Sequence, residues 1–260
     1  MGIYAVTGGT KGIGKETVGI LKSWGHDVIN IDIDAGDIVA DLGTADGRAL
    51  AISQVMKQCP DGLDGLVSNA GVGPIPIYKL SYILSVNYFG GVVLAEGLYA
   101  WLKKKRGNCV MTLTCSGYYS SRGMFSVDAL LNNCGEEERI GRLVDTFDPE
   151  MAGNAIYSSS KVALARWVRR TSASWAANGV NVNAVAPGAV DTTIMQDFRK
   201  PEDGLYDMPM ATLFRQNRAM PPVEIAQALA FLVSPAAKGI SGSILSCDGG
   251  IAAVVDSERV

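Results

Sequence analysis

The segment IYAVTGGTKGIG, residues 3–14, joins a short apolar run to spaced glycines. The apolar residues Ile3–Val6 predict a buried β-strand. Gly8, Gly12 and Gly14 predict a tight turn, because glycine adopts backbone angles that other residues avoid and lets another group approach closely. A helical pattern follows the last glycine. This segment therefore predicts a strand, a glycine-rich turn and a helix at the start of the chain.

The same alternation of strand and helix patterns continues along the chain. The apolar runs are mostly continuous, which is typical of strands covered on both faces, as in a parallel sheet. Predicted strands are Ile3–Thr7, Val28–Asp32, Gly65–Ser68, Val110–Thr114, Val180–Val185 and Ser243–Cys247; predicted helical faces include Ala49, Ile52, Met56 and Cys59, and Leu164, Val168, Thr171 and Trp175. We expect a single domain over residues 1–260, a doubly wound parallel α/β sheet of the Rossmann type with about seven strands and helices on both faces.

Two stretches interrupt this alternation. One is an inserted segment at about 117–153, and the other is a Met-rich and aromatic segment at about 189–222. Long connections in compact domains are usually functional. We therefore expect both stretches to be functional or mobile.

The composition narrows the function classes. A net charge of −3 does not favour nucleic acid or an anionic membrane surface as a partner, and no apolar stretch is expected to reach the ~18 residues of a membrane span. The single histidine, His26, lies in a turn and excludes a two-histidine metal site, so no metal is expected. Five widely spaced cysteines favour a reducing, cytoplasmic location over a disulfide framework.

The glycine-rich turn is suited to a dinucleotide. Its backbone N–H groups and the following helix N-terminus favour a pyrophosphate. Asp32 follows Gly14 by 18 residues, and a carboxylate there can accept both hydroxyls of an adenosine ribose. Lys11 favours the extra phosphate of NADP, but Ile33 rather than a basic residue follows Asp32, so NAD is expected and NADP is less favoured. Asp41 could contact the adenine edge or simply belong to a turn.

Tyr157 and Lys161 lie four residues apart on a predicted helix and therefore share a face. Oxidation of an alcohol needs a base for the hydroxyl proton. A free tyrosine has a pKa of about 10, which a neighbouring ammonium lowers by stabilising the phenolate. Tyr157 is thus a candidate base in oxidation and acid in reduction. A surface pair is the alternative interpretation.

Six motifs occur together in a characteristic order, and the chain resembles the short-chain dehydrogenase/reductase family over nearly its whole length. The motifs are Thr7–Gly14, Asn69-Ala70-Gly71, Asn87, Tyr157–Lys161, Pro187-Gly188 and Asp248-Gly249-Gly250. Within that family the chain is most similar to the bacterial 3α-hydroxysteroid dehydrogenase/carbonyl reductase group. Residues 31–33, residues 85–90 and the long segment before Tyr157 carry this closer likeness.

The resemblance implies roles for further residues. Ser116 would hold the substrate oxygen, although it lies unusually far from Tyr157 and competes with Thr114 and Cys115. Asn87 would hold a water against Lys161, or be a capping or buried amide. Val190 and Thr192 would hold the nicotinamide carboxamide. The full cofactor-binding set is Gly8, Thr10, Lys11, Gly12, Ile13, Gly14, Asp32, Ile33, Asp41, Leu42, Asn69, Ala70, Gly71, Tyr157, Lys161, Pro187, Gly188, Val190 and Thr192.

In the family the segment at about 189–222 closes over the substrate, so the resemblance implies that this segment is a substrate loop. The resemblance also implies a small apolar ring compound as substrate, such as a steroid or terpenoid secondary alcohol or ketone. Candidate substrate contacts are Tyr118, Met195, Phe198 and Met208, because methionine suits apolar surfaces that accept varied shapes. Packing of the loop or of a subunit contact is the alternative. Members of the family commonly form tetramers, and a 117–153 segment that blocks this contact favours a homodimer over a tetramer. A lid or a second interface is an equally compatible interpretation of the segment.

Two other functions use the same scaffold. Some members of the family carry out epimerisation or dehydration without net turnover of the cofactor. A sensor that binds NAD without chemistry is the third hypothesis, although such a protein is expected to have lost Tyr157 or Lys161.

Overall fold

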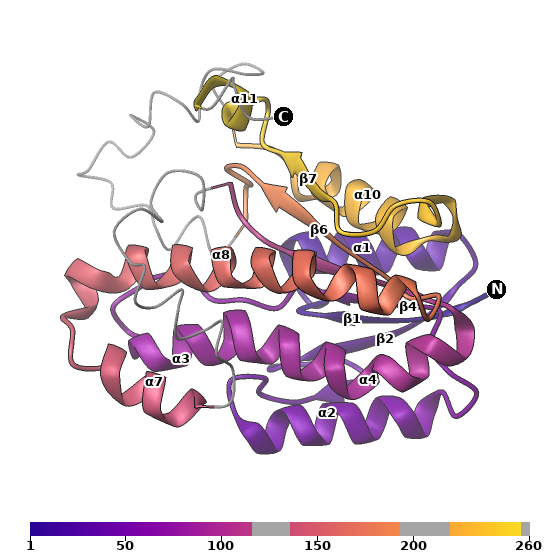
Figure 1. The fold of residues 1–260 in the computed structure, drawn as a ribbon, viewed down its shortest axis with the longest axis horizontal. Coiled ribbons are helices and arrows are strands. Elements are labelled where there is room, and N and C mark those ends of the chain that lie inside the picture. The colour runs from indigo at the N-terminus through magenta and orange to yellow at the C-terminus, as the bar shows by residue number, and fades with distance from the viewer. Residues whose placement is uncertain (116–135, 193–218, 256–260) are drawn as a thin grey trace.

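The structure is a computed structural model that describes residues 1–115, 136–192 and 219–255. Seven parallel strands form one sheet in the order β3-β2-β1-β4-β5-β6-β7 (Figure 1). The strands are β1 (Ile3–Thr7), β2 (Asp27–Asp32), β3 (Ile38–Val39), β4 (Gly65–Ser68), β5 (Asn108–Thr112), β6 (Asn181–Pro187) and β7 (Ile244–Cys247). The predicted doubly wound sheet is confirmed.

Helices connect the strands and cover both faces of the sheet (Figure 1). They are α1 (Gly12–Ser23), α2 (Ala45–Gln58), α3 (Leu80–Leu84), the π-helical turn η1 (Ser85–Gly90), α4 (Gly91–Lys105), α7 (Glu137–Val144), α8 (Pro149–Ala176), α10 (Pro222–Val233), the 3₁₀ turn η4 (Pro235–Ala237) and α11 (Ile251–Val255). One core joins the sheet to α2, α4 and α8, and a second joins it to α1 and α10. Alternate residues of β1 serve the two cores, with Ala5 in the first and Tyr4 and Val6 in the second.

Some predicted boundaries and faces differ from the structure. The fifth strand begins at Asn108 rather than Val110, because the buried Asn108 amide donates to the carbonyls of Val233 and Ser234 at 3.2 and 2.7 Å. A buried amide that is paired in this way carries no desolvation penalty that would exclude it from a strand. The predicted face of α8 is largely confirmed, whereas α2 buries Ala51 and exposes Ala49.

The helical run Leu80–Lys105, which comprises α3, η1 and α4, is long and apolar enough by length and composition to cross a membrane. The expectation that no apolar stretch reaches that length is therefore wrong. Within the protein, 67% of the apolar window is buried. The apolar composition of this run follows from its position between the sheet and neighbouring helices.

Candidate active site

The glycine-rich turn lies where β1 ends and α1 begins. Gly8 and Gly12 have positive φ angles of 68° and 53°, which favour glycine. A Cβ on Gly14 would lie 2.0 Å from the carbonyl oxygen of Gly8, so no side chain fits there. Lys11 precedes α1 without a side-chain cap, and the first turn of α1 has no acidic residue. No side chain therefore caps the first backbone N–H groups of α1. An anion-binding helix terminus requires N–H groups that are left uncapped in this way.

The hydroxyl of Thr7 joins this turn to the end of β4. Its Oγ1 accepts the N–H groups of Asn69 and Ala70, both at 2.9 Å. The Asn69 amide donates to the carbonyls of Thr7 and Gly8, and its Oδ1 accepts the hydroxyl of Thr112 at 3.2 Å. These bonds hold together the carboxyl ends of β1, β4 and β5, the edge at which open parallel sheets bind ligands.

The carboxylate of Asp32 lies beside the glycine-rich turn. Its Oδ2 accepts the N–H of Thr10 at 3.0 Å, and its Oδ1 accepts the N–H of Ile33 at 2.8 Å. The side chain of Ile33 is half-exposed. Lys11 forms an ion pair with Asp34, whose carboxylate lies 3.1 Å from the Lys11 ammonium.

Asp41 has a structural role that does not exclude contact with adenine. Its Oδ1 accepts the N–H of Gly43 at 2.8 Å and the hydroxyl of Tyr82 at 3.1 Å. Burial and the negative charge of Asp41 raise the pKa of Tyr82 to about 12. The neighbouring Leu42 is buried, and its carbonyl accepts a bond from Arg48 at 3.1 Å. The turn alternative for Asp41 is therefore supported.

Lys161 is buried and points from α8 to the end of β5. Its ammonium donates to the carbonyl of Thr112 at 3.0 Å. Burial lowers the pKa of Lys161 to about 8. A Cβ on Gly71 would lie 2.9 Å from Asn87 Oδ1 and 3.5 Å from Lys161 Nζ, so Gly71 leaves room where these two side chains converge.

The side chain of Asn87 is a buried amide, which was the alternative interpretation of this residue. Its Oδ1 accepts the N–H of Val72 at 2.9 Å, and its Nδ2 donates to the carbonyl of Val72 at 3.0 Å. The amide therefore holds the chain that follows Gly71. Binding of a water between Asn87 and Lys161 stays a prediction.

Tyr157 lies one turn before Lys161 on α8 and is partly exposed. Burial raises the pKa of Tyr157 to about 12, a hydrogen bond with the Thr114 side chain lowers it, and the nearby Cys115 thiol raises it. In this structure burial is the largest influence on the pKa of Tyr157, and the Lys161 ammonium donates to the Thr112 carbonyl, so the lowering of this pKa by Lys161 stays a prediction.

Thr114, one of the two residues that compete with Ser116, is thus a described hydroxyl that interacts with Tyr157, and the role of Ser116 stays a prediction. Ser116 lies outside the described residues, as do Tyr118, Met195, Phe198 and Met208. The structure ends β5 at Thr112, so Thr114 lies beyond the strand.

The end of β6 leads to the remaining predicted cofactor contacts. Pro187 O accepts the N–H of Cys115 at 2.8 Å, and Gly188 N donates to Cys247 O at 3.0 Å. A Cβ on Gly12 would lie 3.3 Å from the Thr192 methyl carbon, so the chain after β6 reaches the glycine-rich turn. Val190 is buried beside Met220.

Together these residues fit a nicotinamide dinucleotide. The glycine-rich turn suits the pyrophosphate, Asp32 suits the ribose hydroxyls, and Tyr157 with Lys161 lies across the same edge of the sheet. Within the described ranges, no group of three or more His, Cys, Asp or Glu side chains could hold a metal ion.

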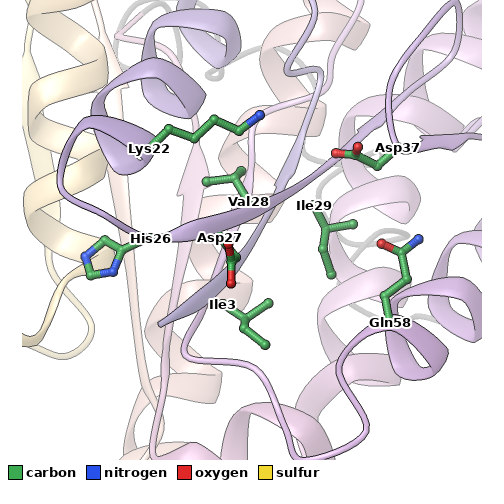
Figure 2. A pocket seen from close by; sticks show the side chains of 8 residues that line it. All are labelled: Ile3, Lys22, His26, Asp27, Val28, Ile29, Asp37 and Gln58. Atoms are coloured by element: carbon green, nitrogen blue, oxygen red, sulfur yellow. The ribbon is translucent and has the colours of Figure 1, made fainter. Parts of the chain in front are cut away.

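A pocket at the opposite edge of the sheet is separate from this site (Figure 2). It is lined by Ile3, Lys22, His26, Asp27, Val28, Ile29, Asp37 and Gln58. Ile3 and Asp27 begin β1 and β2, whereas the candidate active site lies where the strands end. His26 accepts the N–H of Gly2 at 3.1 Å and packs on the Tyr4 ring, so this histidine is more than a surface turn residue.

Comparisons with known proteins identify the family that the chain is similar to. The family model described as enoyl-(acyl carrier protein) reductase matches residues 148–252. The chain is 37% identical to 3-alpha-hydroxysteroid dehydrogenase/carbonyl reductase from Comamonas testosteroni, over 98% of both chains. It is 27% identical to cis-4-hydroxycyclohexanecarboxylate dehydrogenase from Sinomonas cyclohexanicum, over 97% of both. The 3-alpha-hydroxysteroid dehydrogenase from Pseudomonas sp. B-0831, solved with NADH, superposes with a TM-score of 0.89 at 34% identity and covers 99% of this chain and 100% of its own.

The chain belongs to the short-chain dehydrogenase/reductase family. It is an oxidoreductase that acts on CH–OH groups with a nicotinamide dinucleotide.

Proposed function

We propose that the protein interconverts an apolar cyclic secondary alcohol, such as a hydroxysteroid or terpenoid alcohol, and its ketone, with NAD as cofactor and Tyr157 as general acid and base. The observation that carries the proposal is that Tyr157 lies one helical turn before the buried Lys161, whose ammonium donates to the Thr112 carbonyl at the end of β5. Bound NAD supplies the hydride acceptor in oxidation, and its ring adds a positive charge near Tyr157.

Tyr157 moves the proton at the substrate oxygen. In ketone reduction its hydroxyl donates a proton, which suits a group whose pKa is raised to about 12. In alcohol oxidation the phenolate accepts the hydroxyl proton, and this direction depends on positive charge to lower the pKa. Lys161 supplies one such charge, and the Thr112 carbonyl fixes its position.

The proposal that the substrate is an apolar cyclic alcohol rests on the named relatives and on the sequence. It does not rest on side chains that the structure describes. Two relatives are named for hydroxysteroids, and a third is named for a hydroxyl group on a cyclohexane ring. The proposed substrate loop, about 189–222, is rich in Met and aromatic residues, which suits an apolar ring compound.

NAD is proposed over NADP because of the charges near Asp32. Residues 30–40 contain Asp32, Asp34 and Asp37 and no Lys or Arg. A phosphate on the adenosine ribose would approach these carboxylates. The neighbouring Lys11 is already paired with Asp34.

Turnover by the Tyr157→Phe variant tests this function. Purified protein is mixed with NAD and a panel of steroid, monoterpene and simple cyclic alcohols, and nicotinamide absorbance is followed. The variant should lose turnover by about a thousandfold while it binds NAD within about twofold of the wild-type affinity. Tyr99→Phe is the matched control, because Tyr99 stacks on Trp175 away from the site. Retention of most of the rate by Tyr157→Phe would overturn the assignment.

The predicted homodimer and cytoplasmic location stay proposals. The described cysteines Cys59, Cys109, Cys115 and Cys247 are all free thiols, which suits a reducing compartment. Size measurement in solution tests the dimer, and a tetramer would contradict it.

A further inference from the structure

Lys11 and Asp34 form an ion pair directly beside the Asp32 carboxylate. The Lys11 ammonium lies 3.1 Å from Asp34 Oδ2, and the two side chains are 64% and 63% exposed. Thr10, which precedes Lys11, donates its N–H to Asp32 Oδ2 at 3.0 Å. The pair therefore adjoins the carboxylate that is proposed to bind the adenosine ribose.

A second contact fixes the two loops that carry the pair. The Thr10 hydroxyl donates to the carbonyl of Ala35 at 2.8 Å. Thr10 precedes Lys11 and Ala35 follows Asp34, so this hydrogen bond joins the two loops next to the ion pair. The N–H of Asp34 also approaches Asp32 Oδ1 at 3.4 Å. These contacts hold Lys11 and Asp34 facing each other without help from a ligand.

The pairing has a consequence for a phosphate on the ribose. Such a phosphate carries close to two negative charges and would approach the Asp32 and Asp34 carboxylates. Lys11 is the cation best placed to attract it, because residues 30–40 contain no Lys or Arg. Asp34 already accepts from that ammonium, so a phosphate must compete with a carboxylate for it.

We propose that Asp34 determines cofactor specificity: by pairing with Lys11, it withholds this ammonium from the 2′-phosphate of NADP and so favours NAD. This inference rests on the proposed nicotinamide dinucleotide site. In this proposal Lys11, the residue that would otherwise attract the phosphate of NADP, is paired with Asp34 of the same chain. The cofactor preference is thus set by three residues, Asp32, Lys11 and Asp34.

A double-mutant cycle tests the pairing. The dissociation constants of NAD⁺ and NADP⁺ are measured by calorimetry for the wild type, Asp34→Asn, Lys11→Met and the double variant. Asp34→Asn should tighten NADP⁺ binding by about tenfold and leave NAD⁺ within about twofold, since one repulsive charge is removed and one attractive charge is released. Lys11→Met should change NADP⁺ affinity by less than about twofold in the wild type but remove most of the gain in the Asp34→Asn background.

Asp37→Asn is the matched control, because it removes the same charge from the same loop while Asp37 instead accepts the N–H of Asn30. An equal gain in NADP⁺ affinity from Asp37→Asn would overturn the proposal, as would an undiminished gain in the double variant. Unchanged NADP⁺ affinity in Asp34→Asn would also overturn it. Failure of every protein to bind either dinucleotide would instead overturn the proposed function, together with this inference.

Discussion

The ammonium of Lys161 donates to the carbonyl of Thr112, the last residue of β5, at 3.0 Å. The hydroxyl of Thr112 donates in turn to Asn69, whose backbone N–H is bound by Thr7. One residue at the end of β5 therefore links the buried cation of the candidate active site to the glycine-rich turn. These backbone and side-chain contacts from the sheet fix the position of the Lys161 ammonium in the candidate active site.

The stability difference between the wild type and Lys161→Met should depend on pH. Burial lowers the pKa of Lys161 to about 8 in the folded protein, against 10.5 for an unperturbed lysine. Between these values the unfolded chain holds a proton that the folded chain has lost, so wild-type stability rises with pH. Between pH 8 and pH 10.5, the free energy of unfolding of the wild type should rise by on the order of 1 to 3 kcal/mol relative to that of the variant. Urea unfolding at several pH values measures this, and parallel stability curves would contradict it.

Loss of the Thr114 hydroxyl should impair catalysis. Thr114 hydrogen-bonds Tyr157 and lowers its pKa, so Thr114→Val removes a group that stabilises the phenolate. We expect kcat/KM to fall about a hundredfold in Thr114→Val, a loss of the size seen when one active-site donor is removed. Steady-state kinetics measures this, and wild-type kcat/KM in Thr114→Val would contradict the role given to Thr114.

Removal of the Asp32 carboxylate should weaken NAD binding by about tenfold, because hydrogen bonds to a charged group are stronger than neutral ones. NADP binding should change less, since the variant also relieves repulsion of the extra phosphate. The preference for NAD over NADP therefore narrows in Asp32→Ala. Fluorescence titration with both cofactors measures the ratio, and an unchanged ratio would show that Asp32 does not set it.

The ion pair between Arg48 and Glu137 should contribute to stability. Arg48 is only 4% exposed, and its guanidinium contacts Glu137 at 2.6 and 3.2 Å as well as the Leu42 carbonyl. Glu137→Gln removes the charge that compensates a buried cation, so it should cost about 1 to 3 kcal/mol of unfolding free energy. Glu138→Gln, at an exposed pair with Arg142, should stay within about 0.5 kcal/mol. Equal losses in the two variants would contradict the distinction.

Patterns that depend on near neighbours were predicted well from the sequence. The strand, glycine-rich turn and helix at residues 3–14 follow from local spacing, and Tyr157 and Lys161 share a helix face because they are four residues apart. The two-residue strand β3 was not among the predicted strands, since so short a run has too little pattern to distinguish it from a turn.

Features that depend on distant partners could not be predicted. Asn108 enters a buried strand only because carbonyls more than a hundred residues away accept from its amide. Arg48 is buried because Glu137, from the 117–153 segment, approaches α2 in the fold. The raised pKa of Tyr157 depends on burial as well as on its neighbours, and spacing along a helix carries no measure of burial.

The chain on either side of residues 193–218 is joined backbone to backbone. Met220 N donates to Ala189 O and Asp191 N donates to Met220 O, both at 2.8 Å. The scaffold therefore meets this segment at two adjacent points. The entropic cost of closing a chain segment grows slowly, by about 0.6 kcal/mol for each doubling of its length. Insertion or deletion of residues between Thr192 and Ala219 should therefore cost little closure entropy and leave the bonds among Ala189, Asp191 and Met220 in place.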